Sequence, residues 1–257
     1  MHSTWPRSLW LVRHAESAGN VARDRALAAG ADVIDIDMRD VDVPLSECGR
    51  EQAAALARWT RGRDADGRPT VVLTSPYLRA VETAKQLAAT IDEPRGRVPI
   101  VDERLREKEF GALDRLTRAG ITARYPAEVE MRERLGKFYY RPPSGESWCD
   151  VIQRLRGVMI ELQHNYAGEH VAIVAHQVIV LCFRYLLERL DEQEILAIDR
   201  EGDVANGSIT SYRFDASANH GRGGLVLESY NSTTALEHAG VVITAEPTAQ
   251  PDPKSAS

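Results

Sequence analysis

An arginine and a histidine stand side by side directly after the first apolar run of the chain. Residues 9–12 are all apolar, and Arg13 and His14 follow at once. Arginine stays charged and grips phosphate oxygens with paired hydrogen bonds. An imidazole, with an ordinary pKa of about 6.5, is available in its neutral form near pH 7 and can attack phosphorus as a nucleophile. The pair therefore suits the transfer of a phosphoryl group.

Three further groups of matching chemistry follow later apolar runs, namely Arg79, Glu107 and His176. Ligands of open α/β sheets bind outside the carboxyl ends of the strands, so side chains there converge in space. Two arginines can hold a phosphoryl group and also disfavour the protonated form of a nearby imidazole. Glu107 is the candidate acid that protonates the leaving oxygen. Because the arginines and the second imidazole supply positive charge, we expect no metal ion and no cofactor.

The elements that position these groups alternate between short apolar runs and longer segments of helical periodicity. This alternation predicts a three-layer α/β/α fold with a mostly parallel sheet. The expected strands are 9–12, 71–73, 98–101 and 171–175, with a later hairpin of 209–214 and 225–228. The expected helices are 46–60, 77–90, one that opens at Ser147 with Asp150 as a capping partner, and 178–190.

Three segments stand outside this alternation. Residues 23–43 form a connection too long for an ordinary turn, which predicts a functional or mobile segment. Residues from about 112 to 146 read as a small cap inserted into a domain that spans 1–243. Residues 244–257 contain three prolines, and we expect a disordered tail.

Charge and composition exclude several classes of function. The chain has 257 residues and a net charge of −6, which argues against a general nucleic-acid binder. Its three cysteines are too few for a disulfide framework. It contains no apolar run long enough for a signal peptide or a membrane span, so we expect a cytoplasmic protein without membrane attachment. Positions 104–141 nevertheless carry ten basic and six acidic residues, which favours a small phosphorylated ligand as much as a merely solvated surface.

The order of the motifs resembles the histidine phosphatase superfamily, which includes the cofactor-dependent phosphoglycerate mutases and the fructose-2,6-bisphosphatase module. The resemblance extends over roughly residues 9–214. It is carried by 11–17 with Asn20, 44–53, 74–84, 105–111, 145–147 and 174–177. The first motif usually has glycine where this chain has Ala15.

The resemblance implies a role for each candidate residue. His14 would be the phosphorylated nucleophile, and Glu107 the proton donor that later activates water. The phosphate clamp would consist of Arg13, Arg79 and His176. Further contacts to the substrate are implied for Ser17, Asn20, Lys137 and Gln177.

The sequences of 136–147 and 174–177 are most similar to those of the fructose-2,6-bisphosphatase module. In that module, the positions of Lys137 and Gln177 contact sugar phosphate. Arg118 and Leu181 differ from that module's tyrosine and arginine. We therefore expect a metal-independent phosphatase for a small phosphorylated metabolite, without assuming the same substrate.

Several alternatives stay open on the sequence. One is a phosphoglycerate mutase, an isomerase that would return the phosphoryl group to a bound acid. Another is a non-catalytic phosphate-binding module, and a third is a phosphoprotein phosphatase that uses 23–43 as a docking surface. The sequence leaves the oligomeric state undetermined.

Overall fold

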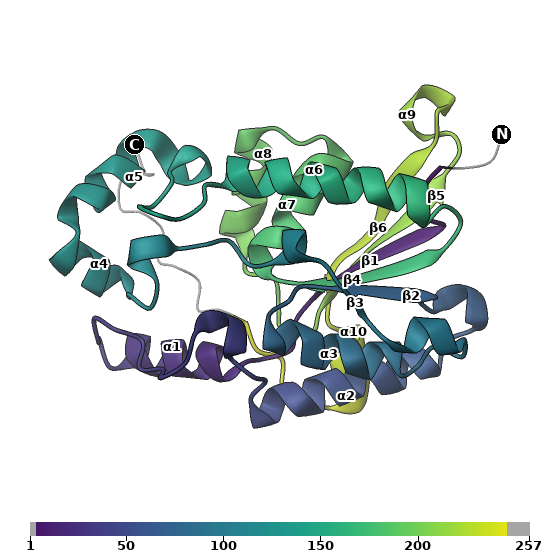
Figure 1. Ribbon diagram of the computed structural model, residues 1–257, viewed down its shortest axis with the longest axis horizontal. Coiled ribbons are helices and arrows are strands. Elements are labelled where there is room, and N and C mark those ends of the chain that lie inside the picture. Colours follow the sequence, from purple (N-terminus) through teal and green to yellow (C-terminus); the bar gives the residue numbers. More distant parts are fainter. Residues whose placement is uncertain (1–3, 246–257) are drawn as a thin grey trace.

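A six-stranded mixed sheet forms the centre of the computed structural model, which describes residues 4–245 (Figure 1). The strand order is β3-β2-β4-β1-β5-β6. The first four strands in the chain are mutually parallel, whereas β5 and β6 form an antiparallel hairpin at one edge. The strands are β1 Ser8–Arg13, β2 Val71–Thr74, β3 Ile100–Val101, β4 His170–Ala175, β5 Ile209–Asp215 and β6 Gly224–Ser232.

Helices cover both faces of this sheet, as the alternation of the sequence predicts. In β1, Leu9 and Leu11 point into one core with α6 and α7, while Trp10 and Val12 point into the other with α2 and α3. Burial on both faces explains why this strand is a continuous apolar run. The helices are α1 Ala18–Ala28, α2 Glu47–Arg61, α3 Leu78–Ala88, α4 Arg118–Arg124, α5 Pro126–Tyr139, α6 Trp148–Asn165, α7 Gln177–Glu188, α8 Glu192–Glu201, α9 Ala218–Gly221 and α10 Thr234–Ala239.

The predicted strands and helices are confirmed to within a few residues, with one exception among the strands. The strand expected over 98–101 is confined to Ile100–Val101, and Val98 is 71% exposed. This strand lies at the free edge of the sheet beside β2, where Ile100 and Val101 remain 44% and 52% exposed. Its apolar run therefore does not indicate a buried strand.

Six of the ten helices within residues 4–245 were not predicted, namely α1, α4, α5, α8, α9 and α10. Helix α1 occupies Ala18–Ala28, so the connection expected over 23–43 starts only after it. Only Asn20 and Ala26 are buried in this helix. Its sequence therefore has no apolar stripe by which a helix could be predicted. Helix α8 fully buries only Ile195, although its capping box of Asp191 and Glu194 was a local signal of a helix start.

The carboxyl ends of the parallel strands face helices from two parts of the chain. Helices α4 and α5 lie within the segment expected to be a cap and stand apart from the two helical layers, with α1 below them (Figure 1). Thr244, which was expected to belong to the disordered tail, is hydrogen-bonded here. Its hydroxyl accepts a bond of 3.0 Å from Gln52 Nε2, and its carbonyl accepts one of 2.8 Å from the Asn206 amide. The remainder of that predicted tail, 246–257, lies outside the described residues.

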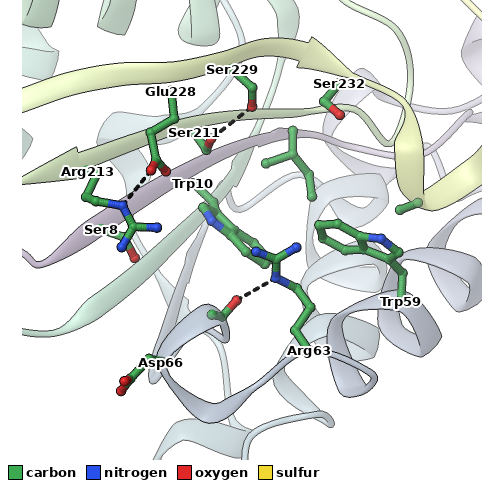
Figure 2. A pocket seen from close by; sticks show the side chains of 13 residues that line it. Ser8, Trp10, Trp59, Arg63, Asp66, Ser211, Arg213, Glu228, Ser229 and Ser232 are labelled. Atoms are coloured by element: carbon green, nitrogen blue, oxygen red, sulfur yellow. Dashed lines mark hydrogen bonds and ion pairs between the residues drawn. The ribbon is translucent and has the colours of Figure 1, made fainter.

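A cavity of about 220 Å³ lies at the opposite end of β1 from these helices, near Ser8, where the strand begins (Figure 2). The guanidinium of Arg63 lies 4.5 Å from the centre of the Trp59 ring and 5.6 Å from that of Trp10. None of the residues predicted to form the functional site lines this cavity. Within residues 4–245, no helix has the length and apolarity needed to cross a membrane.

Candidate active site

His14 lies directly beyond the end of β1, buried, with its proton placement determined by its neighbours. Its Nδ1 lies 2.7 Å from the carbonyl oxygen of Ala15, which can only accept, so Nδ1 carries the proton. Nε2 then has a free lone pair and accepts a hydrogen bond of 3.3 Å from Arg79 Nε. The nitrogen that can act as a nucleophile therefore faces an arginine.

Two arginines flank this ring, as predicted. Arg79 lies in the first turn of α3, and Arg13 is the last residue of β1, where its guanidinium donates to the carbonyl of Val204. Burial, followed by the charges of Arg79 and Arg13, holds the pKa of His14 well below its ordinary value. The imidazole is thus neutral around pH 7.

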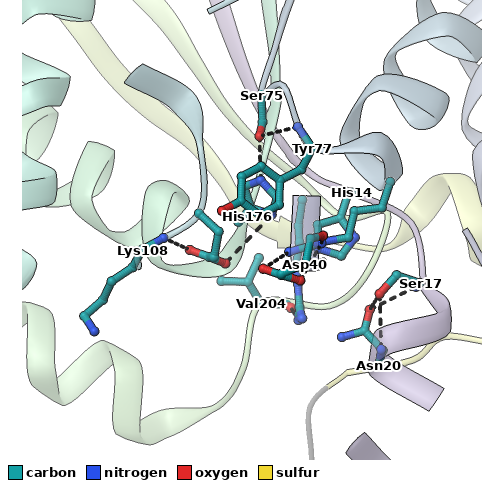
Figure 3. Close-up of polar contacts among 12 residues, drawn as sticks. His14, Ser17, Asn20, Asp40, Ser75, Tyr77, Lys108, His176 and Val204 are labelled. Atoms are coloured by element: carbon teal, nitrogen blue, oxygen red, sulfur yellow. Dashed lines mark hydrogen bonds and ion pairs between the residues drawn. The ribbon is translucent and has the colours of Figure 1, made fainter. Parts of the chain in front are cut away.

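His176 brings a second imidazole beside the first. It follows β4 and precedes α7, and its ring centre lies 5.1 Å from that of His14 (Figure 3). Its Nε2 lies 2.7 Å from Ser75 Oγ, whereas its Nδ1 has no hydrogen-bond partner among residues 4–245. Burial and the charge of Arg79 also lower the pKa of His176. The start of α7 adds backbone amides that suit an anion.

Glu107 is the carboxylate that reaches this pair. Its Oε2 lies 3.8 Å from His176 Nδ1, and its Oε1 accepts a hydrogen bond of 2.7 Å from the Lys108 amide. The neighbouring Glu109 instead accepts a bond of 3.2 Å from the hydroxyl of Tyr77. Of the two, Glu107 is placed to exchange a proton next to the imidazoles.

Ser17 and Asn20 form the capping box of α1, close to the backbone of His14. Asn20 Oδ1 accepts from both the amide and the hydroxyl of Ser17. The side-chain amide of Asn206 donates to the His14 carbonyl at 3.1 Å and lies 3.5 Å from Asn20 Oδ1. Both predicted residues therefore border the site, joined to it by Asn206.

The two residues predicted to contact a sugar phosphate are engaged with α8 and the loop after it. Lys137 Nζ pairs with Asp199 Oδ2 at 2.5 Å, and Gln177 Nε2 donates to Asp203 Oδ1 at 2.6 Å. Gln177 directly follows His176 and borders the site. No contact within the described part of the chain joins Lys137 to either imidazole.

Sequence reasoning missed Asp40, Tyr77 and Asn206. Asp40 binds the guanidinium of Arg79, and the Tyr77 ring lies 5.0 Å from that of His176 (Figure 3). The long connection before α2 was a signal that functional residues lay there. Asn206 gave no signal, because it reaches His14 only through the pairing of β5 with β1.

Comparison with known proteins places this fold and site in a class. A mycobacterial glucosyl-3-phosphoglycerate phosphatase solved with VO3 superposes with a TM-score of 0.66 at 27% identity, over 88% of this chain and all of that one. Bacillus stearothermophilus YhfR superposes with a TM-score of 0.66 at 26% identity, over 89% of this chain and 98% of that one. The fold is that of the phosphoglycerate mutase-like phosphatases.

The chain belongs to the histidine phosphatase superfamily (branch 1), whose family model matches residues 9–223. The 6-phosphofructo-2-kinase/fructose-2,6-bisphosphatase of Gallus gallus is 32% identical over 189 residues, which is 73% of this chain and 34% of that protein. The human 6-phosphofructo-2-kinase/fructose-2,6-bisphosphatase 4 is 31% identical over the same shares. The chain thus spans about a third of the length of these curated relatives.

Proposed function

We propose that the chain hydrolyses the phosphomonoester of a small metabolite, without a metal ion, through a phosphohistidine intermediate on His14. The observation that carries the proposal is the tautomer of His14. The proton sits on Nδ1 beside the Ala15 carbonyl, and the lone pair on Nε2 faces Arg79 at 3.3 Å. A neutral ring whose unprotonated nitrogen faces Arg79, the proposed phosphate-binding cation, can attack phosphorus once a phosphoryl group takes over that hydrogen bond.

In the first half of the proposed reaction, Arg13, Arg79 and His176 hold the phosphoryl oxygens. His14 Nε2 attacks phosphorus, and the bond from phosphorus to the leaving oxygen breaks as the new P–N bond forms. The protonated carboxyl of Glu107 gives its proton to that oxygen, and the alcohol leaves. The fixed positive charges stabilise the charge that spreads over the phosphoryl oxygens.

In the second half, Glu107 is a carboxylate and accepts a proton from water as the water oxygen attacks phosphorus. The P–N bond breaks, His14 regains its lone pair, and inorganic phosphate leaves. Each half uses Glu107 in the protonation state that the other half produces. No step in this cycle requires a metal ion.

The test of the intermediate is rapid quenching with a radiolabelled phosphomonoester. The wild type should retain an acid-labile label on the protein, and His14→Ala should retain none. His164→Ala is the matched control, because His164 is exposed on α6 and bonded only within its helix. Equal labelling of the wild type and His14→Ala would contradict the proposal.

The substrate class we propose is a phosphorylated sugar or sugar acid. Support comes from the names of the relatives, a fructose-2,6-bisphosphatase and a glucosyl-3-phosphoglycerate phosphatase, and from the basic segment 104–141. A phosphate-release screen over sugar phosphates, phosphoglycerates, nucleotides and phosphopeptides tests this class. Release from phosphopeptides alone would favour a phosphoprotein phosphatase, and transfer between phosphoglycerates without release would favour a mutase.

A further inference from the structure

The guanidinium of Arg79 already makes four hydrogen bonds within the protein itself. Its Nη1 donates to Asp40 Oδ1 at 2.9 Å and to the Asp40 backbone carbonyl at 2.7 Å. Its Nη2 donates to Asp40 Oδ2 at 3.2 Å, and its Nε donates to His14 Nε2 at 3.3 Å. All three nitrogens of this arginine therefore have partners before any substrate binds.

The carboxylate of Asp40 imitates the group that the proposed function assigns to Arg79. Carboxylates and phosphoryl groups both present two acceptor oxygens that match the fork of a guanidinium. Asp40 and a phosphoryl group thus need the same donors. They also carry like charges, so they repel each other if both crowd one arginine.

The carboxylate of Asp40 can move away while the guanidinium of Arg79 stays in place. The side chain of Asp40 is 42% exposed, whereas that of Arg79 is 7% exposed. A rotation of the Asp40 side chain therefore carries its carboxylate into water without moving the arginine. The Asp40 backbone carbonyl keeps its bond to Arg79 Nη1 throughout, so the guanidinium remains oriented.

The backbone at Asp40 is held from both sides. We call residues 31–43 the strap. Arg115, in the segment before α4, donates to the carbonyls of Ile36 at 2.9 Å and Met38 at 2.7 Å. Beyond the strap, the Leu45 amide donates to Glu82 of α3 at 2.8 Å. The strap therefore presents the Asp40 carbonyl firmly while its carboxylate remains exchangeable.

We propose that Asp40 is an internal competitor: the phosphoryl group of the substrate displaces its carboxylate from Arg79, and this exchange sets the affinity of the site. The inference rests on the proposed function. A ligand with a single carboxylate gains nothing from the exchange, since it replaces one carboxylate with another. A phosphoryl group gains further bonds, because it also meets Arg13 and His176. Asp40 thereby selects phosphoryl groups over singly charged anions, and its return helps to release phosphate.

The experiment measures the binding of inorganic phosphate by calorimetry, and KM and kcat for p-nitrophenyl phosphate. Asp40→Ala removes the carboxylate and keeps the backbone carbonyl, and Asp40→Asn removes only the charge. Both variants should bind phosphate about fivefold more tightly, the effect expected for losing one half-exposed ion pair, with KM lowered in parallel. Asp42→Asn is the matched control, because Asp42 lies in the same turn and pairs with the exposed Arg39. It should leave both quantities unchanged.

Weaker phosphate binding with a lower kcat in Asp40→Ala would overturn the proposal, because it would make the carboxylate a positioning residue for Arg79. Unchanged binding in both Asp40 variants would overturn it as well. Phosphate binding that tightens in the variants of a protein that forms no phosphoenzyme would support the competitor and refute the proposed hydrolysis alone. The two proposals therefore fail separately.

Discussion

Glu107 and Glu109 lie two positions apart, yet their surroundings give them different roles. Glu107 faces His176 Nδ1 at 3.8 Å, while Glu109 is bonded to Tyr77 and lies 3.7 Å from Arg106. Position therefore selects Glu107 as the acid of the proposed reaction.

Glu107→Gln should slow the hydrolysis of alkyl phosphates by about 100-fold or more, because their leaving oxygen needs a proton. The formation of the phosphoenzyme from p-nitrophenyl phosphate should change far less, since that leaving group is stable without one. The measurement is the rate of phosphoenzyme formation from each ester, in parallel with Glu109→Gln as a control. Equal losses with both esters would remove Glu107 from the acid role.

At the scale of elements, the caps of the helices are the features that local sequence predicts best. The helix predicted to open at Ser147 begins there as α6, with Asp150 completing the capping box. Such a box depends on residues three positions apart, so local sequence is sufficient for it. The start of α2 at Ser46 is confirmed for the same reason, since the Ser46 hydroxyl accepts from the Gly49 amide.

Ser147→Ala should lower the free energy of unfolding by about 1 kcal/mol, the usual cost of losing an N-cap. Ser147 is buried and bonded to both the amide and the carboxylate of Asp150, which favours a loss of this size or larger. Urea unfolding measures the difference. Ser217→Ala is the control, because Ser217 is exposed and caps no helix with its side chain. A loss no greater than that of the control would contradict the capping role.

At the scale of the whole molecule, two buried histidines link folding to pH. The pKa values of His14 and His176 are both lowered, first by burial and then by neighbouring positive charge. In the unfolded chain both rings take up protons near pH 6.5, while in the folded protein they resist protonation. Protonation therefore favours the unfolded state, and the stability that these rings contribute is lost as pH falls below about 6.5.

The free energy of unfolding should fall by up to about 2.7 kcal/mol per pH unit below pH 6 from these two groups together. Urea titrations between pH 7.5 and 5 measure this slope. The double variant His14→Asn, His176→Asn should show a flatter dependence, and His164→Asn, which changes an exposed ring, should keep the wild-type slope. An unaltered slope in the double variant would rule out the histidines as its source.

The ends of individual strands, visible in the sequence, predict much of the site. Arg13 ends a buried strand, His14 and His176 directly follow buried strands, and parallel strands bring their carboxyl ends to one edge. Local order along the chain therefore determines that these groups meet. The alternation of runs and helices likewise determines the layers, because a strand buried on both faces must be apolar throughout.

Only the tertiary structure decided which charges are paired. Asp40 binds Arg79 across 39 positions of sequence, and Lys137 pairs with Asp199 across 62. Such contacts depend on how the strap and the segment of α4 and α5 fold back over the sheet, and no local pattern encodes that path. The sequence by itself determined that the arginines and histidines proposed to bind phosphate gather at the end of β1. The fold decided that one of them is held by a carboxylate of the same chain, since the long connections place opposite charges together regardless of their distance in sequence.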